Sequence, residues 1–136
     1  MIVTPLYAAL LTFWFLLLSA IVIRHRGKGI SLGDGGNPVV QRAVRGHANF
    51  AEYVPLALIM MAILELARTS LYLLHALGLL LLVGRILHGY ALSFTRRWQF
   101  GRSWGTALTF VVLVVEAVLC LLVALRGHDL WIRGLL

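Results

Sequence analysis

The sequence predicts an all-α integral membrane protein, a bundle of four transmembrane helices. Hydrophobic residues make up 61% of the 136-residue chain and charged residues only 12%, whereas soluble domains average about 25% charged residues. Four apolar runs each reach the roughly 20 residues that a helix needs to cross a bilayer. None of these runs alternates polar and apolar residues, which argues against a transmembrane β-barrel.

The apolar runs and the residues that bound them define the four spans. We expect helices at residues 5–23, 39–67, 71–94 and 104–125. Pro5 is well placed to start the first helix, and Asn37 and Pro38 suit the N-cap and first position of the second. Only residues 68–70 separate the second and third spans, so these two helices must form an antiparallel hairpin. At this length, residues 1–136 are expected to form one domain.

Basic residues are distributed unevenly between the two sides of the membrane. Eight Lys and Arg residues flank the first and third connections, whereas three lie on the opposite side. The positive-inside rule therefore puts the long loops in the cytoplasm and both termini outside. The net charge of +7 also suits anionic lipid headgroups or an anionic ligand. Nucleic acid is a poor fit, because the sequence contains no soluble basic domain.

A polar stripe enters the second span. Successive helical residues are turned by about 100°, so Arg42, Arg45, Asn49 and Glu52 fall within about 80° of each other. A charged stripe inside a bilayer is costly unless it faces a protein interior or a wet cavity. The stripe is therefore a candidate binding site.

A second polar pair lies on the third span, where Arg85 and His88 are three residues apart and share a face. Glu52 and Arg85 both lie roughly 21–22 Å from the outer end of their helices, so neighbouring antiparallel helices could bring them together. One interpretation is an ion pair that only satisfies two buried charges. The other is a polar pocket toward the cytoplasmic side, built from Arg45, Asn49, Glu52, Arg85 and His88. We favour the pocket, because five polar groups at similar depth exceed what one ion pair requires.

Other polar residues of the spans have simpler interpretations. Glu65 and Arg68, near the outer surface, are expected to form an interfacial pair. Glu116 has no evident partner, so it either carries a proton or meets a partner across an oligomer interface. Pro55 should kink the second helix and open space beside Glu52. No Cys/His cluster has zinc spacing, so no metal site is expected.

Three sequence segments together resemble the signature of the MAPEG superfamily, the membrane-associated proteins in eicosanoid and glutathione metabolism, and in particular its bacterial branch. The segments are Gly33-Asp-Gly-Gly36, Arg45-Gly-His-Ala-Asn49-Phe-Ala-Glu52-Tyr53-Val-Pro55 and Gly84-Arg85-Ile-Leu-His88. The resemblance covers about residues 1–126. It implies a homotrimer of four-helix bundles in a bacterial inner membrane. It further implies that glutathione binds as co-substrate between neighbouring subunits, near the cytoplasmic side.

The resemblance also implies roles for individual residues. Arg102 and Ser103 resemble the pair proposed to activate the thiol of glutathione, with Arg102 stabilising the thiolate and Ser103 donating a hydrogen bond. The chain departs from several transferases at Ala48 and Leu92, where those proteins carry an arginine and a tyrosine. Seven further residues are expected to bind glutathione: Arg24, Arg26, Arg45, Asn49, Glu52, Arg85 and His88.

Three functions are compatible with this pattern. The leading hypothesis is a glutathione-dependent membrane transferase or peroxidase that acts on hydrophobic electrophiles, which would enter from the lipid. The alternative is a non-catalytic lipid-binding or scaffold protein that uses the same trimer cleft. A small transporter or channel is less favoured, because no pair of broken helices is visible in the sequence.

Overall fold

The computed structural model describes residues 1–27, 29–96 and 98–132, with side chains described as far as Gly127. Its four α-helices are α1 (Val3–Arg26), α2 (Pro38–Leu66), α3 (Leu71–Ser93) and α4 (Gln99–Ile132). All four are long and apolar enough to cross a membrane. The prediction of a four-helix membrane bundle is therefore confirmed. Lys28, Arg97 and Arg133, which contributed to the predicted orientation, lie outside the described residues.

The helix ends follow local chemistry more closely than hydropathy. The side chain of Asn37 accepts a hydrogen bond from the backbone N–H of Val39 at 2.9 Å, so α2 has the predicted N-cap. In contrast, α4 begins at Gln99 and not at residue 104. A hydropathy window marks the apolar part of a helix, and a helix can continue past it into polar sequence. Arg102 and Ser103 consequently lie inside the first turns of α4.

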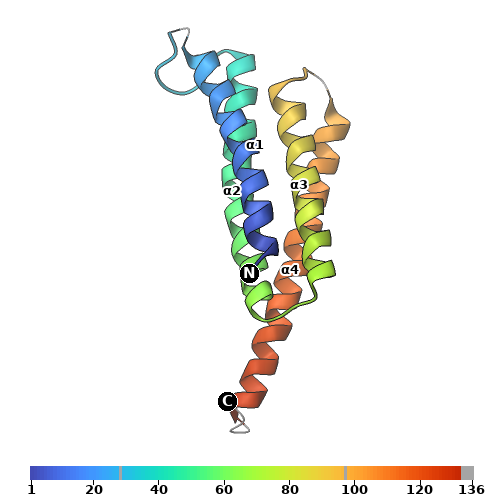
Figure 1. The fold of residues 1–136 in the computed structure, drawn as a ribbon. Helices are drawn as coiled ribbons and strands as arrows, with labels where there is room; N and C mark the ends of the chain where they lie inside the picture. Colours follow the sequence, from blue (N-terminus) through green and yellow to red (C-terminus); the bar gives the residue numbers. More distant parts are fainter. Residues whose placement is uncertain (28, 97, 133–136) are drawn as a thin grey trace.

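The helices run alternately up and down (Figure 1). α1 packs against α2 and α3, and α4 packs against α3 and α2. The α1–α2 and α3–α4 connections lie together at one end of the bundle, the top of Figure 1, which we call the loop end. The short turn between α2 and α3 lies at the opposite end, near the N-terminus, as the predicted hairpin requires.

Glycines on α3 allow close packing of α1. A Cβ atom on Gly78 would lie 2.2 Å from the ring of Tyr7, and one on Gly89 would lie 2.9 Å from Nε1 of Trp14. The two aromatic rings of α1 therefore lie directly on the backbone of α3. Around them, the bundle buries an apolar core that includes Leu11, Leu18, Val54, Met61, Leu64, Leu74, Leu81 and Val112.

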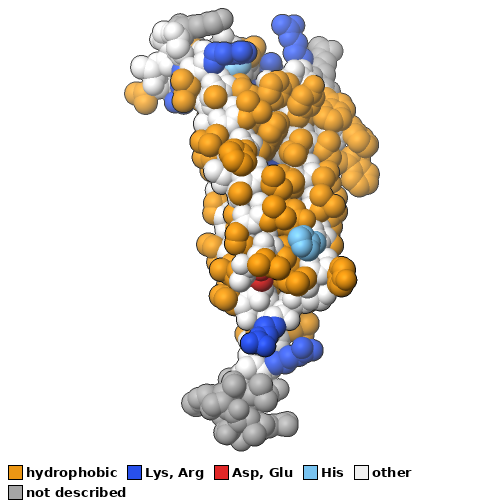
Figure 2. Space-filling model, viewed as in Figure 1, with side chains coloured by type: hydrophobic (Ala, Val, Ile, Leu, Met, Phe, Trp, Pro, Cys, Tyr) orange, Lys and Arg blue, Asp and Glu red, His pale blue; other side chains and the backbone are white. Residues whose placement is uncertain are grey.

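The outer surface is that of a membrane protein. Hydrophobic side chains cover the middle of the molecule, and Lys and Arg side chains lie toward its ends (Figure 2). Large apolar side chains are exposed along the helices, among them Phe13, Ile59 and Val114 at 71%, 58% and 63%. Such a continuous apolar belt is stable only against lipid or another apolar protein surface. The chain is therefore an integral membrane protein.

The side chain of Glu65 connects the end of α2 to the start of α1 through hydrogen bonds. Its carboxylate accepts hydrogen bonds from the backbone N–H groups of Ile2, Val3 and Thr4, at 2.9 Å for Val3 and 2.8 Å for Thr4. A carboxylate at a helix N-terminus satisfies N–H groups that have no partner within the helix. The prediction that Glu65 pairs with Arg68 is therefore wrong, because the start of α1 supplies its hydrogen bonds.

Candidate functional site

A buried arginine is the centre of a polar cluster between α2, α3 and α4. Arg85 is 1% exposed. Its guanidinium donates hydrogen bonds to Oδ1 of Asn49 at 3.1 Å and, more weakly, to Oγ1 of Thr109 at 3.5 Å. The guanidinium also lies 5.7 Å from the ring centroid of Phe50, as in a cation–π contact. These partners are all neutral, and Nε of Arg85 has no hydrogen-bond partner.

The expected pairing of Glu52 with Arg85 is not observed. Glu52 is exposed on α2, and none of the described hydrogen bonds of Arg85 ends on a carboxylate. Asn49 lies nearly one turn earlier on α2 and takes the place expected for Glu52. Matching depth in two helices is not enough for contact, because a residue must also face the neighbouring helix. Arg85 is therefore a buried cation that forms no ion pair within the described part of the chain.

His88 is oriented by its contact with Arg85. Nδ1 of His88 lies 3.3 Å from Nη2 of Arg85. An arginine nitrogen can only donate, so Nδ1 accepts and the ring proton is on Nε2. His88 is buried, yet it lines a cavity at the loop end. It can therefore offer a hydrogen-bond donor to a ligand in that cavity.

Two glycines hold α4 close to this cluster. A Cβ atom on Gly105 would lie 2.6 Å from the carbonyl oxygen of Gly84 and 2.7 Å from the backbone nitrogen of His88. A Cβ atom on Gly84 would in turn lie 3.1 Å from the carbonyl oxygen of Gly105. Small residues at a helix crossing allow backbones to approach in membrane proteins. This contact brings the start of α4, including Arg102, toward α3.

The cavity between α2, α3 and α4 brings together four of the predicted site residues. It has a volume of about 350 Å³ and is lined by Gln41, Arg42, Arg45, Asn49, His88, Leu92 and Arg102. Small-molecule pockets are typically about 300–1,000 Å³ in volume. Three of the lining residues are arginines, and none is acidic. We call this space the arginine cavity; its chemistry suits an anionic ligand with several hydrogen-bonding groups.

The other predicted site residues do not line this cavity. Arg85 lies behind it and touches two of its lining residues, Asn49 and His88. Ser103 and Glu52 are exposed on α4 and α2. Arg24 and Arg26 lie at the end of α1, which packs against α2 and α3 and supplies no lining residue. One chain therefore assembles only part of the predicted site.

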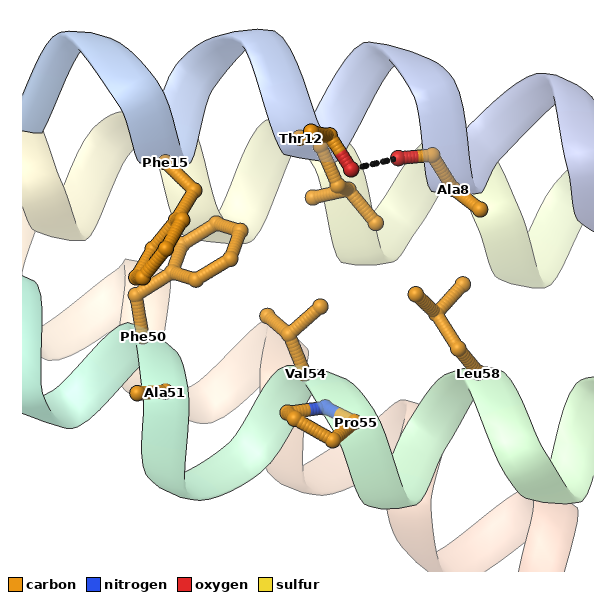
Figure 3. A pocket seen from close by; sticks show the side chains of 9 residues that line it. Ala8, Thr12, Phe15, Phe50, Ala51, Val54, Pro55 and Leu58 are labelled. Carbon is orange, nitrogen blue, oxygen red and sulfur yellow. Dashed lines mark hydrogen bonds between the residues drawn. The ribbon is translucent and has the colours of Figure 1, made fainter.

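An apolar groove lies between α1 and α2 on the same chain (Figure 3). It has a volume of about 260 Å³, and its lining includes Phe15, Phe50, Val54, Pro55 and Leu58. Thr12 also lines the groove, but its hydroxyl donates to the carbonyl of Ala8 at 2.7 Å, as the dashed line in Figure 3 marks. Space was expected beside Pro55 and Glu52. Pro55 lines the groove together with residues of α1, and Glu52 is not among the described lining residues.

Comparison with known proteins agrees with this architecture. The model of the MAPEG family matches residues 4–122, nearly the whole chain. The chain belongs to the MAPEG family. Among curated proteins, the inner membrane protein YecN of Escherichia coli K12 and its counterpart in E. coli O6:H1 are similar to this MAPEG chain. Both are 33% identical over 114 residues, which cover 83% of this chain and 86% of YecN. These relatives and the four apolar helices support an integral inner-membrane location.

The MAPEG chain also contains site residues that were not among the predicted ligand-binding and catalytic residues. Thr109 and Trp14 support Arg85: Thr109 accepts from its guanidinium, and Nε1 of Trp14 donates to its backbone carbonyl at 3.1 Å. Both side chains come from other helices, so no spacing in the sequence marks them. Arg42 and Gln41 line the arginine cavity. For Arg42 a signal existed, because it lies on the polar stripe one turn before Arg45.

Glu116 lies apart from the cavity. It is 0% exposed, and neither carboxyl oxygen has a hydrogen-bond partner among the described residues. Because the chain itself buries Glu116, the side chain cannot meet a partner across an oligomer interface. That alternative is therefore wrong. Glu116 is instead a polar group enclosed among apolar residues, a costly arrangement for the fold.

Proposed function

We propose that this MAPEG protein is a glutathione-dependent membrane transferase or peroxidase acting on hydrophobic electrophiles. The observation that carries the proposal is the arginine cavity, with the unpaired charge of Arg85 behind its wall. Glutathione has two carboxylates, an ammonium group and a thiol. Arginines bind carboxylates through charge-assisted, often paired, hydrogen bonds. Family membership and the chemistry of the cavity therefore support the same ligand.

The arginines, Asn49 and His88 each have a role in this proposal. Arg42 and Arg45 hold the carboxylates, and Asn49 and the Nε2–H of His88 bind the peptide groups. Arg85 fixes Asn49 and His88 through the hydrogen bonds described above and adds positive charge from behind. Arg102, which lines the cavity from α4, stabilises the thiolate, because a nearby cation favours the ionised form of a thiol.

In the proposed transferase reaction, the thiolate of glutathione is the nucleophile. Its sulfur forms a bond to an electrophilic carbon, and that carbon's leaving group departs with the electron pair. With a hydroperoxide as acceptor, two glutathione molecules supply two electrons and yield glutathione disulfide, an alcohol and water. The apolar groove between α1 and α2 is one place where an apolar co-substrate can dissolve from the lipid.

We further propose that the site is completed in a homotrimer. Glu52 is exposed on a membrane helix, and an unpaired carboxylate facing lipid is costly. The surface of a second copy would cover Glu52 and close the open side of the arginine cavity. Ser103 would then reach the ligand of a neighbouring subunit. The mass of the complex in mild detergent tests this: three chains are expected, and a monodisperse monomer would contradict it.

Spectroscopic detection of the glutathione thiolate tests the catalytic part of the proposal. Bound glutathione should show the ultraviolet absorbance of a thiolate at a pH where free glutathione is mainly the thiol. The signal and the rate with a hydrophobic electrophile should both fall about 10²-fold or more in Arg102→Gln, since removing one stabilising donor typically costs that much. Arg24→Gln is the control for loss of an arginine. A thiolate signal unchanged in Arg102→Gln would reject this role.

The alternative is a non-catalytic lipid-binding or scaffold protein. The apolar groove favours it, because the one hydroxyl in its lining is already bonded within α1. This alternative predicts that the folded protein binds fatty acyl chains and has no measurable affinity for glutathione. A glutathione titration therefore separates the two functions.

A further inference from the structure

A second arginine-lined cavity adjoins the first at the loop end. It has a volume of about 130 Å³ and is lined by Arg42, Ala91, Leu92, Arg96, Trp98, Gln99 and Arg102. Among its described lining residues, three are arginines, from α2, the α3–α4 connection and α4, and none is acidic. Arg42 and Arg102 are shared with the arginine cavity, whereas Arg96 lines only the smaller one. This arrangement concentrates positive charge in a space too small for a peptide.

The start of α4 adds to the positive field of this cavity. Gln99, the first residue of α4, is in the lining, and α4 has no acidic residue in its first turn. The first N–H groups of a helix have no partner within the helix and carry a partial positive charge. A small anion held by the arginines would also lie near these N–H groups. A phosphate group has the size and charge that this combination accommodates.

Exposed aromatic rings lie beside the same cavity. Trp98 lines it and is 39% exposed, and Phe94 in the same connection is 49% exposed. Tyr90 links the two, since its ring stacks on Phe94 at 5.2 Å and meets Trp98 edge-on at 5.9 Å between centroids. Exposed aromatic rings beside basic residues are typical of the level of the lipid headgroups. A free anion in water would gain nothing from these rings, whereas lipid chains would cover them.

We propose that this smaller cavity binds the phosphate of an anionic phospholipid. Arg42, Arg96 and Arg102 hold the phosphate, and the exposed rings of Tyr90, Phe94 and Trp98 lie against the lipid's glycerol and upper acyl chains. Trp98 can donate its indole N–H at the headgroup level. The proposal does not require a glutathione complex. Arg42 and Arg102 also line the arginine cavity, so the test uses Arg96, which lines only the smaller one.

The test compares lipid binding by two arginine variants of the full-length protein in uncharged detergent. Short-chain phosphatidylglycerol is titrated calorimetrically, with short-chain phosphatidylcholine and inorganic phosphate as separate probes. Wild type should bind phosphatidylglycerol saturably and more tightly than either other probe. Arg96→Gln should weaken this binding about fivefold, the effect of one basic residue near a headgroup. Arg24→Gln, which removes an exposed arginine from the same end of the bundle, should leave it unchanged.

Three outcomes would overturn the proposal. Equal binding of both phospholipids would show that the headgroup charge is not recognised. Equal losses in Arg96→Gln and Arg24→Gln would show a diffuse charge effect and not a cavity. Inorganic phosphate binding as tightly as phosphatidylglycerol would assign the cavity to a free anion. Thermal unfolding of both variants checks that each retains the fold, and both should, because neither arginine is in the core.

Discussion

Glu65 lies at the end of α2, and Arg85 lies inside α3 next to the arginine cavity; the two charged residues differ in what satisfies them. Glu65 receives hydrogen bonds from three backbone N–H groups of its own chain. Arg85 is more deeply buried but has only neutral partners, with its Nε unbonded. A charge that its own chain satisfies serves the fold. A charge left partly unsatisfied behind a cavity adds a positive field that favours an anionic ligand there.

The largest expected effect concerns the glycine contact that places Arg102 near this unsatisfied cluster. In Gly105→Ala the new methyl group would meet backbone atoms of Gly84 and His88, which cannot move aside cheaply. We expect a loss of about 3 kcal/mol in the free energy of unfolding, at the upper end of overpacking effects. Gly127→Ala on the same helix has open space and should be neutral or slightly stabilising. Denaturant unfolding in detergent micelles measures both; equal effects would contradict the close α3–α4 contact.

The next largest effect concerns Glu65, whose charge is satisfied by its own chain. Glu65→Gln removes the charge that accepts from the start of α1, so the free energy of unfolding should fall by about 2 kcal/mol, the scale of hydrogen bonds to charged groups. Arg68→Gln should have little effect, because Glu65 is bonded to α1. Thermal unfolding distinguishes the two variants. A similar loss in both would restore the interfacial pair that the sequence predicted.

Glu116 is a third case, a buried charged-type residue away from any ligand cavity. It has no hydrogen-bond partner among the described residues and lines neither arginine-rich cavity. Glu116→Met replaces the carboxyl group with an apolar one of similar volume. The protein should become more stable by about 1 kcal/mol, because burying an unpartnered polar group costs free energy. The melting temperature should therefore rise. A clear fall would contradict the account of Glu116 as a buried group without a partner.

The smallest expected effect concerns a single supporting contact of Arg85. Thr109→Val removes a weak hydrogen bond to the guanidinium and should lower the free energy of unfolding by about 1 kcal/mol. Thr106→Val, nearly one turn away on α4, removes only an exposed hydroxyl that bonds to its own helix and should change it by less than about 0.5 kcal/mol. If the two variants unfold alike, Thr109 does not support Arg85.

The sequence predicted the helices well because apolar length and capping are local signals. Asn37 and Pro38 marked the start of α2, and the short 68–70 turn required the hairpin. The start of α4 was placed too late, because hydropathy does not detect a polar helical turn at the membrane surface. Helix count and topology therefore need little more than the one-dimensional pattern.

The site was only partly predictable. The spacing of residues along one helix does not show which of its faces meets a neighbouring helix. The polar stripe placed Arg45 and Asn49 correctly at a cavity, yet it suggested Glu52 where Asn49 is the partner of Arg85. Thr109 and the Gly84–Gly105 contact depend on how α4 rotates against α3, which no local pattern specifies. Long-range packing therefore decides which polar residues meet.

A glutathione titration tests the central claim most directly, namely that the arginine cavity binds this anionic peptide. We expect saturable calorimetric binding to the wild-type protein, weakened about tenfold in Arg45→Gln, as removing one charge-assisted contact predicts. Arg24→Gln and wild type should differ less, because Arg24 does not line the cavity. Absence of binding to well-folded wild-type protein, or an equal loss in both variants, would contradict the account.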